Sequence, residues 1–329
     1  MFTLENVKPE LGVTATEVWG ELKDGFIAEQ VMPLTEVGTM KGTFKYVPQQ
    51  GLLKVPPTLE RAAKGTVSEV EYSYLYQDFE CKEKAVQTSV DDQEKLNAAS
   101  DTMEAVGTSR TTYALRLDYE RAVATKVGSN FGDAVTASVL WSSATAKAVK
   151  DVNEARRAMR ALGLRPNALV MSTNIVDMLM EHDAIKTSVP VTQSTETMPR
   201  DVFLNHLKSL FRLDYIYEAS TQIDTAPVGI DSALESIWPD DTVYLMRIAR
   251  TPSLVDLAPL GFGRTFVYNG SLPSEMAEYA DFPKLLGSAP GIVTEKMRNL
   301  NPPADVYRCT CWMDTPVFSN LCNVAIGVA

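Results

Sequence analysis

The stretch Trp141–Ser172, WSSATAKAVKDVNEARRAMRALGLRPNALVMS, contains the clearest helix of the chain and the strand that follows it. A helix is predicted over residues 144–162, because apolar side chains recur there at helical spacing. The buried face of this helix should consist of Val149, Val152, Ala155, Met159 and Leu162. Gly163 is placed to end the helix, and the run Ala168–Ser172 then predicts a short strand.

Further helices and strands alternate after this unit. Ser172 or Thr173 can cap a helix that continues through Met180, and Asp201 can begin another. The apolar face of the second helix should consist of Val202, Phe203, His206, Leu207, Leu210 and Phe211. Strands are predicted at Leu213–Tyr217 and Thr242–Ile248. This half of the chain is therefore expected to form a compact α/β unit.

The sequence before this unit is less regular. Residues 1–40, in which glycines and Pro33 are spread throughout, predict an extended arm with short structured pieces. Residues 41–65, KGTFKYVPQQGLLKVPPTLERAAKG, combine prolines and glycines with five basic residues and a single acid. They contain too few apolar side chains for a core and predict a long exposed loop or loose hairpin. The basic residues are Lys41, Lys45, Lys54, Arg61 and Lys64.

The next segment is acidic, with ten acids and three lysines between Thr66 and Glu104. Strand periodicity, and hence a packed strand face, is predicted for Val70, Tyr72, Tyr74, Tyr76, Phe79 and Cys81. From about Leu96 to Val127 the spacing becomes helical, and Gly107 is a candidate for a break into two helices. One stripe of this helical region contains Leu115, Tyr119, Ala122, Val123 and Val127.

The chain becomes rich in strand-forming residues after Thr251. The segments SLVDLAPLGFGRTFVYNG, GIVTEKM and DVYRCTCWM all have this character. The final residues, LCNVAIGVA, are apolar and are expected to be buried.

Composition limits the classes of function. The 329 residues are 45% hydrophobic, which permits a large core, and no apolar run reaches the roughly 18–20 residues that cross a bilayer. The N-terminus lacks the layout of a signal peptide, so synthesis in the cytoplasm is expected. A net charge of -11 argues against nucleic-acid binding by simple electrostatics, although not against enclosing nucleic acid.

Residues suited to catalysis are few. His182 follows a predicted helix end, where a solvated cation is expected, and His206 lies near an apolar helix face, where a packing role is expected. The glycines of Gly261–Phe266, GFGRTF, resemble a phosphate-binding loop, but the third glycine and the following helix are missing, so a tight turn is expected.

Metal-binding patterns are equally weak. The cysteines, at positions 81, 309, 311 and 322, do not form a zinc array and should be buried thiols. The acid pairs Asp91–Asp92 and Asp240–Asp241 should serve as caps or turns. We expect no catalytic, cofactor or metal site. A basic loop and an acidic segment in one chain instead favour self-association, with the loop of one copy lying over an acidic surface of the next.

Several segments resemble one protein family. The Trp near a run of small residues, the helix DVNEARRAM and the turn GLRPNALVM come first. NIVDMLMEHDAIK, DVFLNHLKSLFRLDYIYEAS, IWPDDTVYLMRIA and APLGFGRTFVY follow. In this order, over roughly residues 40–275, they resemble the major capsid proteins of tailed bacteriophages. Pro239 stands where the family usually has Gly, and the last fifty or so residues match less clearly.

The resemblance implies an α+β fold of the Hong Kong 97 type, with the following map. An N-terminal arm would occupy residues 1–40, and an extended loop that reaches a neighbour would occupy 41–80. A peripheral domain with a long spine helix would occupy 81–139, and an axial α/β domain 140–255. Return strands of the peripheral domain would occupy 256–308, and a C-terminal segment near the axial domain 309–329.

The same resemblance implies a structural protein without enzymatic activity. Hexamers and pentamers would form an icosahedral shell around double-stranded DNA, with portal, scaffolding and decoration or cement proteins as partners and no membrane. The inter-subunit contact residues would be the five bases of the loop. The protein would be made in the host cytoplasm and reside in the virion.

Three alternatives remain open. The first is an encapsulin-type compartment shell. The second is a soluble α/β enzyme, which the shortage of histidine and the missing nucleotide loop disfavour. The third is a phage tail or decoration protein, which the order of helices and strands disfavours.

Overall fold

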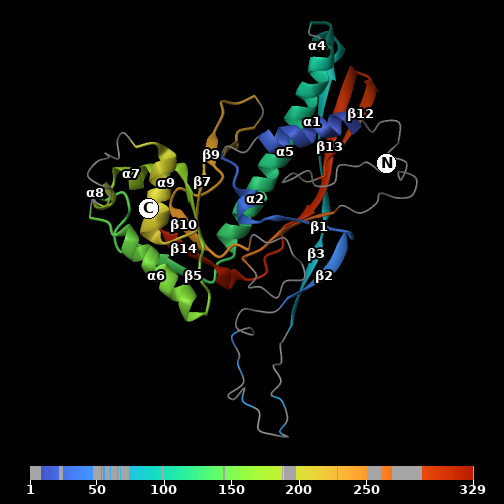
Figure 1. Ribbon diagram of the computed structural model, residues 1–329. Coiled ribbons are helices and arrows are strands. Elements are labelled where there is room, and N and C mark those ends of the chain that lie inside the picture. Colours follow the sequence, from blue (N-terminus) through green and yellow to red (C-terminus); the bar gives the residue numbers. More distant parts are fainter. Residues whose placement is uncertain are drawn as a thin grey trace.

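The computed structural model describes residues 9–21, 25–46, 74–97, 100–143, 145–186, 198–227, 229–249, 261–268 and 291–328, with single residues at 53, 55, 60, 65, 67 and 188. Two five-stranded sheets organise these residues, and the long helix α5 (Ser100–Ser129) runs beside the first of them (Figure 1). No helix among the residues described is long and apolar enough to cross a membrane.

The first sheet is built around its longest strand, β13 (Pro303–Asp314). Its strand order is β1-β11-β13-β12, and β4 pairs with the other edge of β13. The bounds are β1 Leu34–Val37, β4 Lys82–Asp91, β11 Thr265–Tyr268 and β12 Val293–Leu300. β1 is parallel to β11 and the other pairs are antiparallel. Strands that are distant in sequence therefore meet on β13.

The helix α5 packs against β4 and β13, with Thr111 bonded to Cys309 of β13 and Asp118 to Lys84 of β4. The predicted stripe is confirmed at Leu115, Tyr119, Val123 and Val127, all of which are buried. The predicted break at Gly107 was wrong, because the helix runs through this position. A Cβ at Gly107 would lie 2.7 Å from Cδ2 of Tyr307, so the glycine allows the helix to approach the ring of β13 closely.

The second sheet has the order β5-β14-β10-β6-β7 and forms the α/β lobe (Figure 1). Its strands are β5 Asp133–Thr136, β6 Ala168–Ser172, β7 Tyr215–Ala219, β10 Thr242–Met246 and β14 Asn323–Gly327. Its helices are α6 Ala148–Ala161, α7 Thr173–Glu181, α8 Asp183–Lys186 and α9 Arg200–Phe211. The predicted burial of the chain end is confirmed, since Val324, Ile326 and Val328 are fully or almost fully buried.

Two local predictions in this lobe were wrong. Val202 was placed on the buried face of α9 but is 41% exposed, whereas Phe203, Leu207 and Phe211 are buried as expected. Ser172 stands at the N-cap of α7 without a side-chain capping bond, and the Thr173 hydroxyl instead donates to Glu218 and to the carbonyl of Ala219. Acceptors on the adjacent strand β7 therefore bind the hydroxyl that could otherwise cap the helix.

The remaining elements connect or flank the sheets. They are α1 Pro9–Glu21, α2 Ala28–Val31, β2 Lys41–Tyr46, β3 Leu75–Glu80, α4 Asp92–Asn97, β8 Gln222–Asp224, β9 Leu234–Ser236 and a 3₁₀ turn at Asn320–Cys322. α1 packs on α5, although an extended arm with short pieces was expected for residues 1–40. β2 pairs with β3 and β8 pairs with β9 as separate two-stranded sheets.

The predicted domain limits can be compared with these sheets. β13 crosses the limit between residues 308 and 309 without interruption, and the chain passes to the second sheet only after Asp314. β5 lies before residue 140 but belongs to the second sheet. Parts of the predicted peripheral and axial segments are thus interleaved.

The close packing at Gly107 gives a stability prediction. Gly107→Ala should destabilise the subunit by about 1 kcal/mol, because overpacking against the buried Tyr307 costs roughly 1–3 kcal/mol and exceeds the gain in helix propensity. Urea unfolding of the unassembled chain measures this difference. Gly20→Ala in α1 is the matched control, since its Cβ would meet nothing within 4 Å and should be neutral or stabilising. A Gly107→Ala protein as stable as the Gly20→Ala protein would contradict the account.

Candidate interaction surfaces

The β2–β3 hairpin carries the two predicted contact residues that fall within the structure, Lys41 and Lys45. Lys41 Nζ lies 2.5 Å from Glu80 Oε1, directly across the hairpin. Lys45 Nζ lies 3.6 Å from the centroid of the Tyr74 ring. Both cations therefore contact their own hairpin. The other three predicted contact residues, Lys54, Arg61 and Lys64, lie outside the described residues.

One face of this hairpin is fixed to the first sheet by aromatic packing. The ring centroids of Phe44 and Phe318 are 5.0 Å apart, and those of Phe79 and Phe266 are 4.7 Å apart. Tyr46 Oη donates a hydrogen bond of 2.7 Å to the carbonyl of Phe318. Rings at these distances pack favourably, so the root of the hairpin is held in one direction.

Apolar surface remains on the rest of the hairpin. The tyrosines of the predicted strand were expected to be packed, but Tyr74 is 43% and Tyr76 65% exposed. Leu75 is 46% exposed as well. Adjacent exposed rings and a leucine on a projecting hairpin are typical of a protein contact surface. Val70 and Tyr72 lie outside the described residues.

A buried carboxylate, Glu120 of α5, joins three parts of the chain. It accepts hydrogen bonds from the backbone amides of Ile27 at 3.1 Å and Ala28 at 2.9 Å. It also accepts one of 2.7 Å from the indole of Trp238, which precedes β10. Burial raises the pKa of Glu120, and these donors oppose the rise. Glu120 therefore connects the N-terminal segment, the long helix and the α/β lobe.

Arg116 lies one turn earlier on α5 and supports the same junction. Its guanidinium is buried, 4.9 Å from the Phe26 ring centroid and 5.2 Å from that of Trp19. Burial lowers its pKa, while the charges of Glu29 and Glu120 oppose this. Trp19 donates its indole N–H to Glu29, which lies 3.7 Å from Arg116. A buried charge of this kind is tolerated because it is paired.

Six charged side chains form a network where α4 and α5 meet β12 and β13. Arg298 binds both Asp92 and Asp305, the latter at 3.0 Å. Lys95 lies 2.8 Å from Asp305 and 3.2 Å from Asp92. Lys296 completes the network by pairing with Glu104 and, at 3.3 Å, with Asp305. The hydrogen bonds from Arg298 lower the pKa of Asp92 to about 2.

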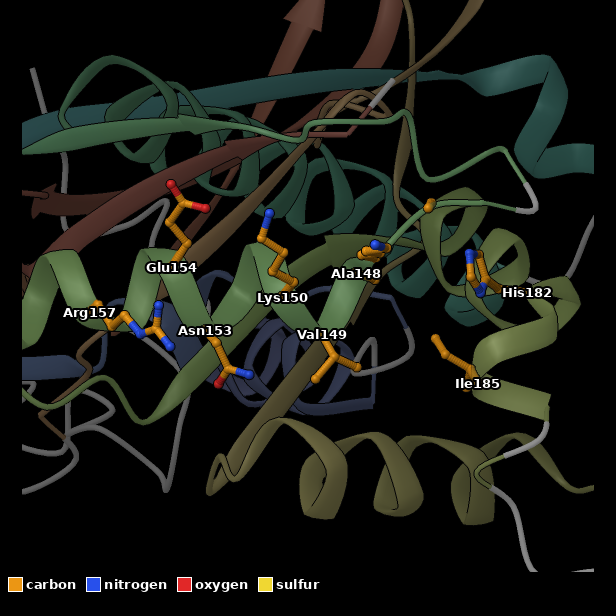
Figure 2. Close-up of a pocket in the computed structure, with 10 residues that line it drawn as sticks. Ala148, Val149, Lys150, Asn153, Glu154, Arg157, His182 and Ile185 are labelled. Carbon is orange, nitrogen blue, oxygen red and sulfur yellow. The ribbon is translucent and has the colours of Figure 1, made fainter.

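A pocket of about 440 Å³ opens between the start of α6 and the junction of α7 with α8 (Figure 2). Its lining combines cations with apolar side chains: Ala146, Lys147, Ala148, Val149, Lys150, Asn153, Glu154, Arg157, His182 and Ile185. Figure 2 shows Lys150 and Glu154 on one side of α6 and Val149 and Asn153 on the other. The positive side chains exceed the negative ones along this helix.

His182 differs from its predicted environment, whereas His206 has the packing role that was predicted. His182 was predicted to be solvated but is only 5% exposed, because its backbone connects α7 to α8 through bonds with Leu179, Ile185 and Lys186. His206 is half-buried, and its Nε2 lies 3.0 Å from Ser188 Oγ.

The four cysteines are buried free thiols, as predicted. Cys309 accepts a hydrogen bond from Thr111, and burial raises the pKa of Cys311 to about 12. The part of the chain that the structure describes contains no group of three or more His, Cys, Asp or Glu side chains placed to hold a metal.

The acid pairs and the glycine turn all take part in hydrogen bonds or ion pairs within the fold. Asp91 accepts from the amide of Gln93, whereas Asp92 binds Arg298. Asp240 accepts from Asn174 and Asp241 from Thr242. In the glycine turn, Phe262 N donates to the carbonyl of Arg247. The members of each acid pair thus bind different partners. Asp91 bonds a nearby backbone amide, as predicted for a cap or turn, whereas Asp92 and Asp240 bind side chains distant in the sequence.

Sequence reasoning did not find Glu120. Its partners lie 92, 93 and 118 residues away in the chain, so no local pattern identifies them. The one available signal is an acid beside Tyr119 in the apolar stripe of α5.

No protein-family model matches the chain, and no curated protein matches it. Solved structures do. A crystal structure of a phage-related protein from Bordetella bronchiseptica RB50 is similar at a TM-score of 0.66 and 16% identity, over 98% of this chain and 97% of that one. A crystal structure of a virus-like particle from Pyrococcus furiosus is similar at a TM-score of 0.56 and 10% identity, over 98% of this chain and 100% of that one. The capsid structure of the cyanophage P-SCSP1u is similar at a TM-score of 0.52 and 8% identity, over 91% of this chain and 86% of that one.

The Glu120 junction predicts a large loss of stability on truncation. Glu120→Ala should cost about 3–5 kcal/mol, since it leaves three buried donors without their acceptor and removes a negative charge near the buried Arg116. Trp238→Phe removes a single donor and should cost about 1–3 kcal/mol. Chemical unfolding of the subunit measures both. Glu154→Ala, on the exposed side of α6, should change stability by less than about 0.5 kcal/mol. Equal effects of the Glu120 and Glu154 variants would show that the junction is not structural.

The network at Asp92 predicts a dependence on acid. Because its folded pKa is depressed from 3.8 to about 2, the ionised carboxylate stabilises the fold fully above about pH 4, and this contribution is lost as the pH falls through 2. Asp92→Asn should therefore lose less thermal stability between pH 4 and pH 2 than the wild type. Melting temperatures across this range test it, with Asp231→Asn as a control at an exposed carboxylate. Parallel curves for the wild type and Asp92→Asn would exclude the effect.

Proposed function

We propose, from the premise that this chain has the Hong Kong 97-type fold of phage capsid proteins, that it is the major capsid protein of a tailed bacteriophage. The observation that carries the proposal is the extent of the structural likeness. It covers nearly all of this chain and of a phage-related protein, and so includes both sheets, α5 and the β2–β3 hairpin. At such low sequence identity the likeness supports the fold, and the function is inferred from it together with the surfaces described above.

Assembly through many copies is supported by the distribution of exposed apolar groups. The hairpin presents Tyr74, Leu75 and Tyr76, and the other end of the first sheet presents Leu96 and Leu300, which are 85% and 83% exposed. A contact at each of these places would bury apolar surface against a different neighbour. Weak contacts repeated over a closed lattice produce a stable shell.

The finer points of the proposal concern the particle. Identical copies form hexamers and pentamers that enclose double-stranded DNA in the virion, with portal, scaffolding and decoration or cement proteins as partners. The five bases of residues 41–65 contact a neighbouring subunit. The protein has no catalytic activity. Among the described residues, no carboxylate is bonded to the Ser188–His206 pair, as an acyl-transfer triad would need.

A compartment shell is the second candidate. The likeness to a virus-like particle from Pyrococcus furiosus leaves it open, because that similarity supports the fold of a shell subunit and does not identify the content of the shell. The two candidates differ in their content, nucleic acid in one case and protein cargo in the other.

Electron microscopy of the negatively stained protein, expressed alone and with the products of neighbouring genes, tests the proposal. Closed shells, or hexamers and pentamers, are expected. Nucleic acid in shells from the producing host would favour the phage capsid, and co-purified protein cargo would favour the compartment. A monomer under every condition would contradict both the capsid and the compartment shell and would favour the soluble α/β enzyme.

The loop bases predict an assembly defect. Lys54→Glu/Arg61→Glu should leave the subunit folded but reduce the yield of shells. Each contact whose charge is reversed is worth only about 0–1 kcal/mol, but the same contacts recur in every subunit. Circular dichroism checks folding and electron microscopy counts shells. The control, Lys126→Glu/Lys208→Glu, changes the charge equally on α5 and α9. Normal shell yield from the loop variant would refute the role of the loop.

A further inference from the structure

The α/β lobe carries positive charge along one helix, α6. Five bases lie at its N-cap and along its length: Lys147, Lys150, Arg156, Arg157 and Arg160. All are exposed except Arg156, which is half-buried. Of the two acids on this helix, Asp151 is buried and accepts a hydrogen bond of 3.0 Å from Trp141, and only Glu154 is exposed. The outer side of α6 is therefore cationic over its whole length.

Three more arginines extend this charge at one end of the sheet. Arg165 precedes β6, Arg212 precedes β7, and Arg247 follows β10. Ala168 pairs with Tyr215 on one side and with Met246 on the other, so the three arginines stand at the same end of adjacent strands.

Asn167 fixes the backbone of these three segments. Its amide N–H donates to the carbonyl of Met246, and its carbonyl accepts from Tyr215, both at 3.0 Å. Its side chain forms two bonds of 2.8 Å with the backbone of Ile248. The arginines are therefore carried on rigid rather than loose backbone.

Two guanidinium groups of this region, those of Arg156 and Arg247, contact backbone carbonyls of other arginines instead of carboxylates. Arg156 Nη2 lies 3.4 Å from the carbonyl of Arg212, and Arg247 Nη1 lies 3.0 Å from that of Arg165. Burial lowers the pKa of Arg156, and the charges of Arg212 and Arg165 lower it further. Among the described residues, Arg156, Arg165, Arg212 and Arg247 form no ion pair with a carboxylate. A bound anion would relieve this repulsion.

We propose that the bases of α6, together with Arg165, Arg212 and Arg247, form a surface that binds the phosphodiester backbone of double-stranded nucleic acid inside the shell. We call it the α6 basic surface. This inference rests on the proposed function, because it requires a shell that encloses nucleic acid. Binding is independent of sequence, since a helix surface that contacts phosphates alone obtains no information from the bases.

The form of the surface favours a phosphate backbone over an acidic protein. The 14 residues of α6 span about 21 Å, over which a DNA duplex presents roughly twelve charges. Among the described residues, α6 itself exposes no large apolar side chain, and Leu53, which lies against Gly163 just past its end, is the exposed apolar side chain found beside it. Protein interfaces normally contain apolar or aromatic anchors at their centre, and the exposed side of α6 lacks them.

The net charge of -11 does not oppose local binding. At about 0.1 M salt, charges more than roughly 10 Å away are largely screened, so the acids elsewhere on the chain act weakly at this surface. The binding is expected to be modest and strongly dependent on salt, which is compatible with packaging and release of a genome.

The test is fluorescence anisotropy of a labelled duplex of about 30 base pairs, titrated with the purified, unassembled full-length chain between about 50 and 200 mM salt. Arg156→Gln/Arg165→Gln should weaken binding about tenfold at the low-salt end and reduce the salt slope by about 1.8, because two phosphate contacts are lost. Arg110→Gln/Lys126→Gln, which removes the same charge from exposed positions of α5, should bind like the wild type.

Equal binding by the two double variants, or no binding by the wild type, would overturn the inference. Poly-L-glutamate that competes as well as unlabelled duplex would overturn it in favour of an acidic protein partner. Electron micrographs of the wild type and both double variants under assembly conditions, made separately from the binding titration, keep the two proposals apart. Normal shells without duplex binding at this surface would refute only the inference, whereas a wild type that forms no assemblies would refute the proposed function.

Discussion

The fold depends on one buried carboxylate. Glu120 holds the amides of Ile27 and Ala28 and the indole of Trp238, so a single side chain of α5 fixes the N-terminal segment and the α/β lobe to the long helix. Its burial would be costly without these donors and the nearby Arg116. The first sheet packs on the same helix, and the β2–β3 hairpin takes its direction from aromatic packing on that sheet. A shell subunit needs such rigidity, since its contacts with neighbours must have the same geometry in every copy.

Some apolar and positively charged side chains lie on the surface of the subunit, outside its packed core. The hairpin is fixed at Phe44 and Phe79 but exposes Tyr76, and the far end of the first sheet exposes Leu300 beside a network of balanced charges. The α6 basic surface lies on the other lobe and carries arginines that meet carbonyls instead of acids. The exposed apolar side chains and the α6 basic surface thus lie on different parts of the subunit. This separation is consistent with contacts between copies at the first sheet. It is also consistent with a contact between α6 and the contents of the shell.

The sequence predicted the parts that depend on local periodicity. The helix predicted over residues 144–162 is present at Ala148–Ala161, and the strand Ala168–Ser172 and the buried chain end were correct, because each is decided by apolar spacing within a few residues. Gly107 was misjudged, since its role depends on Tyr307, two hundred positions later. His182 was misjudged because its burial comes from the join between α7 and α8. Glu120 and the cluster around Arg165 and Arg212 were not predicted, as both are created by the pairing of distant segments.

A cryo-electron microscopy reconstruction of the assembled particle is the most direct test of the account, because it shows assembly and subunit orientation together. The account predicts a closed icosahedral shell in which residues 41–80 of each copy lie against a neighbouring copy and α6 faces the interior. A particle in which these residues contact no neighbour, or in which the chain forms no shell, would contradict the central claim that this is a capsid subunit.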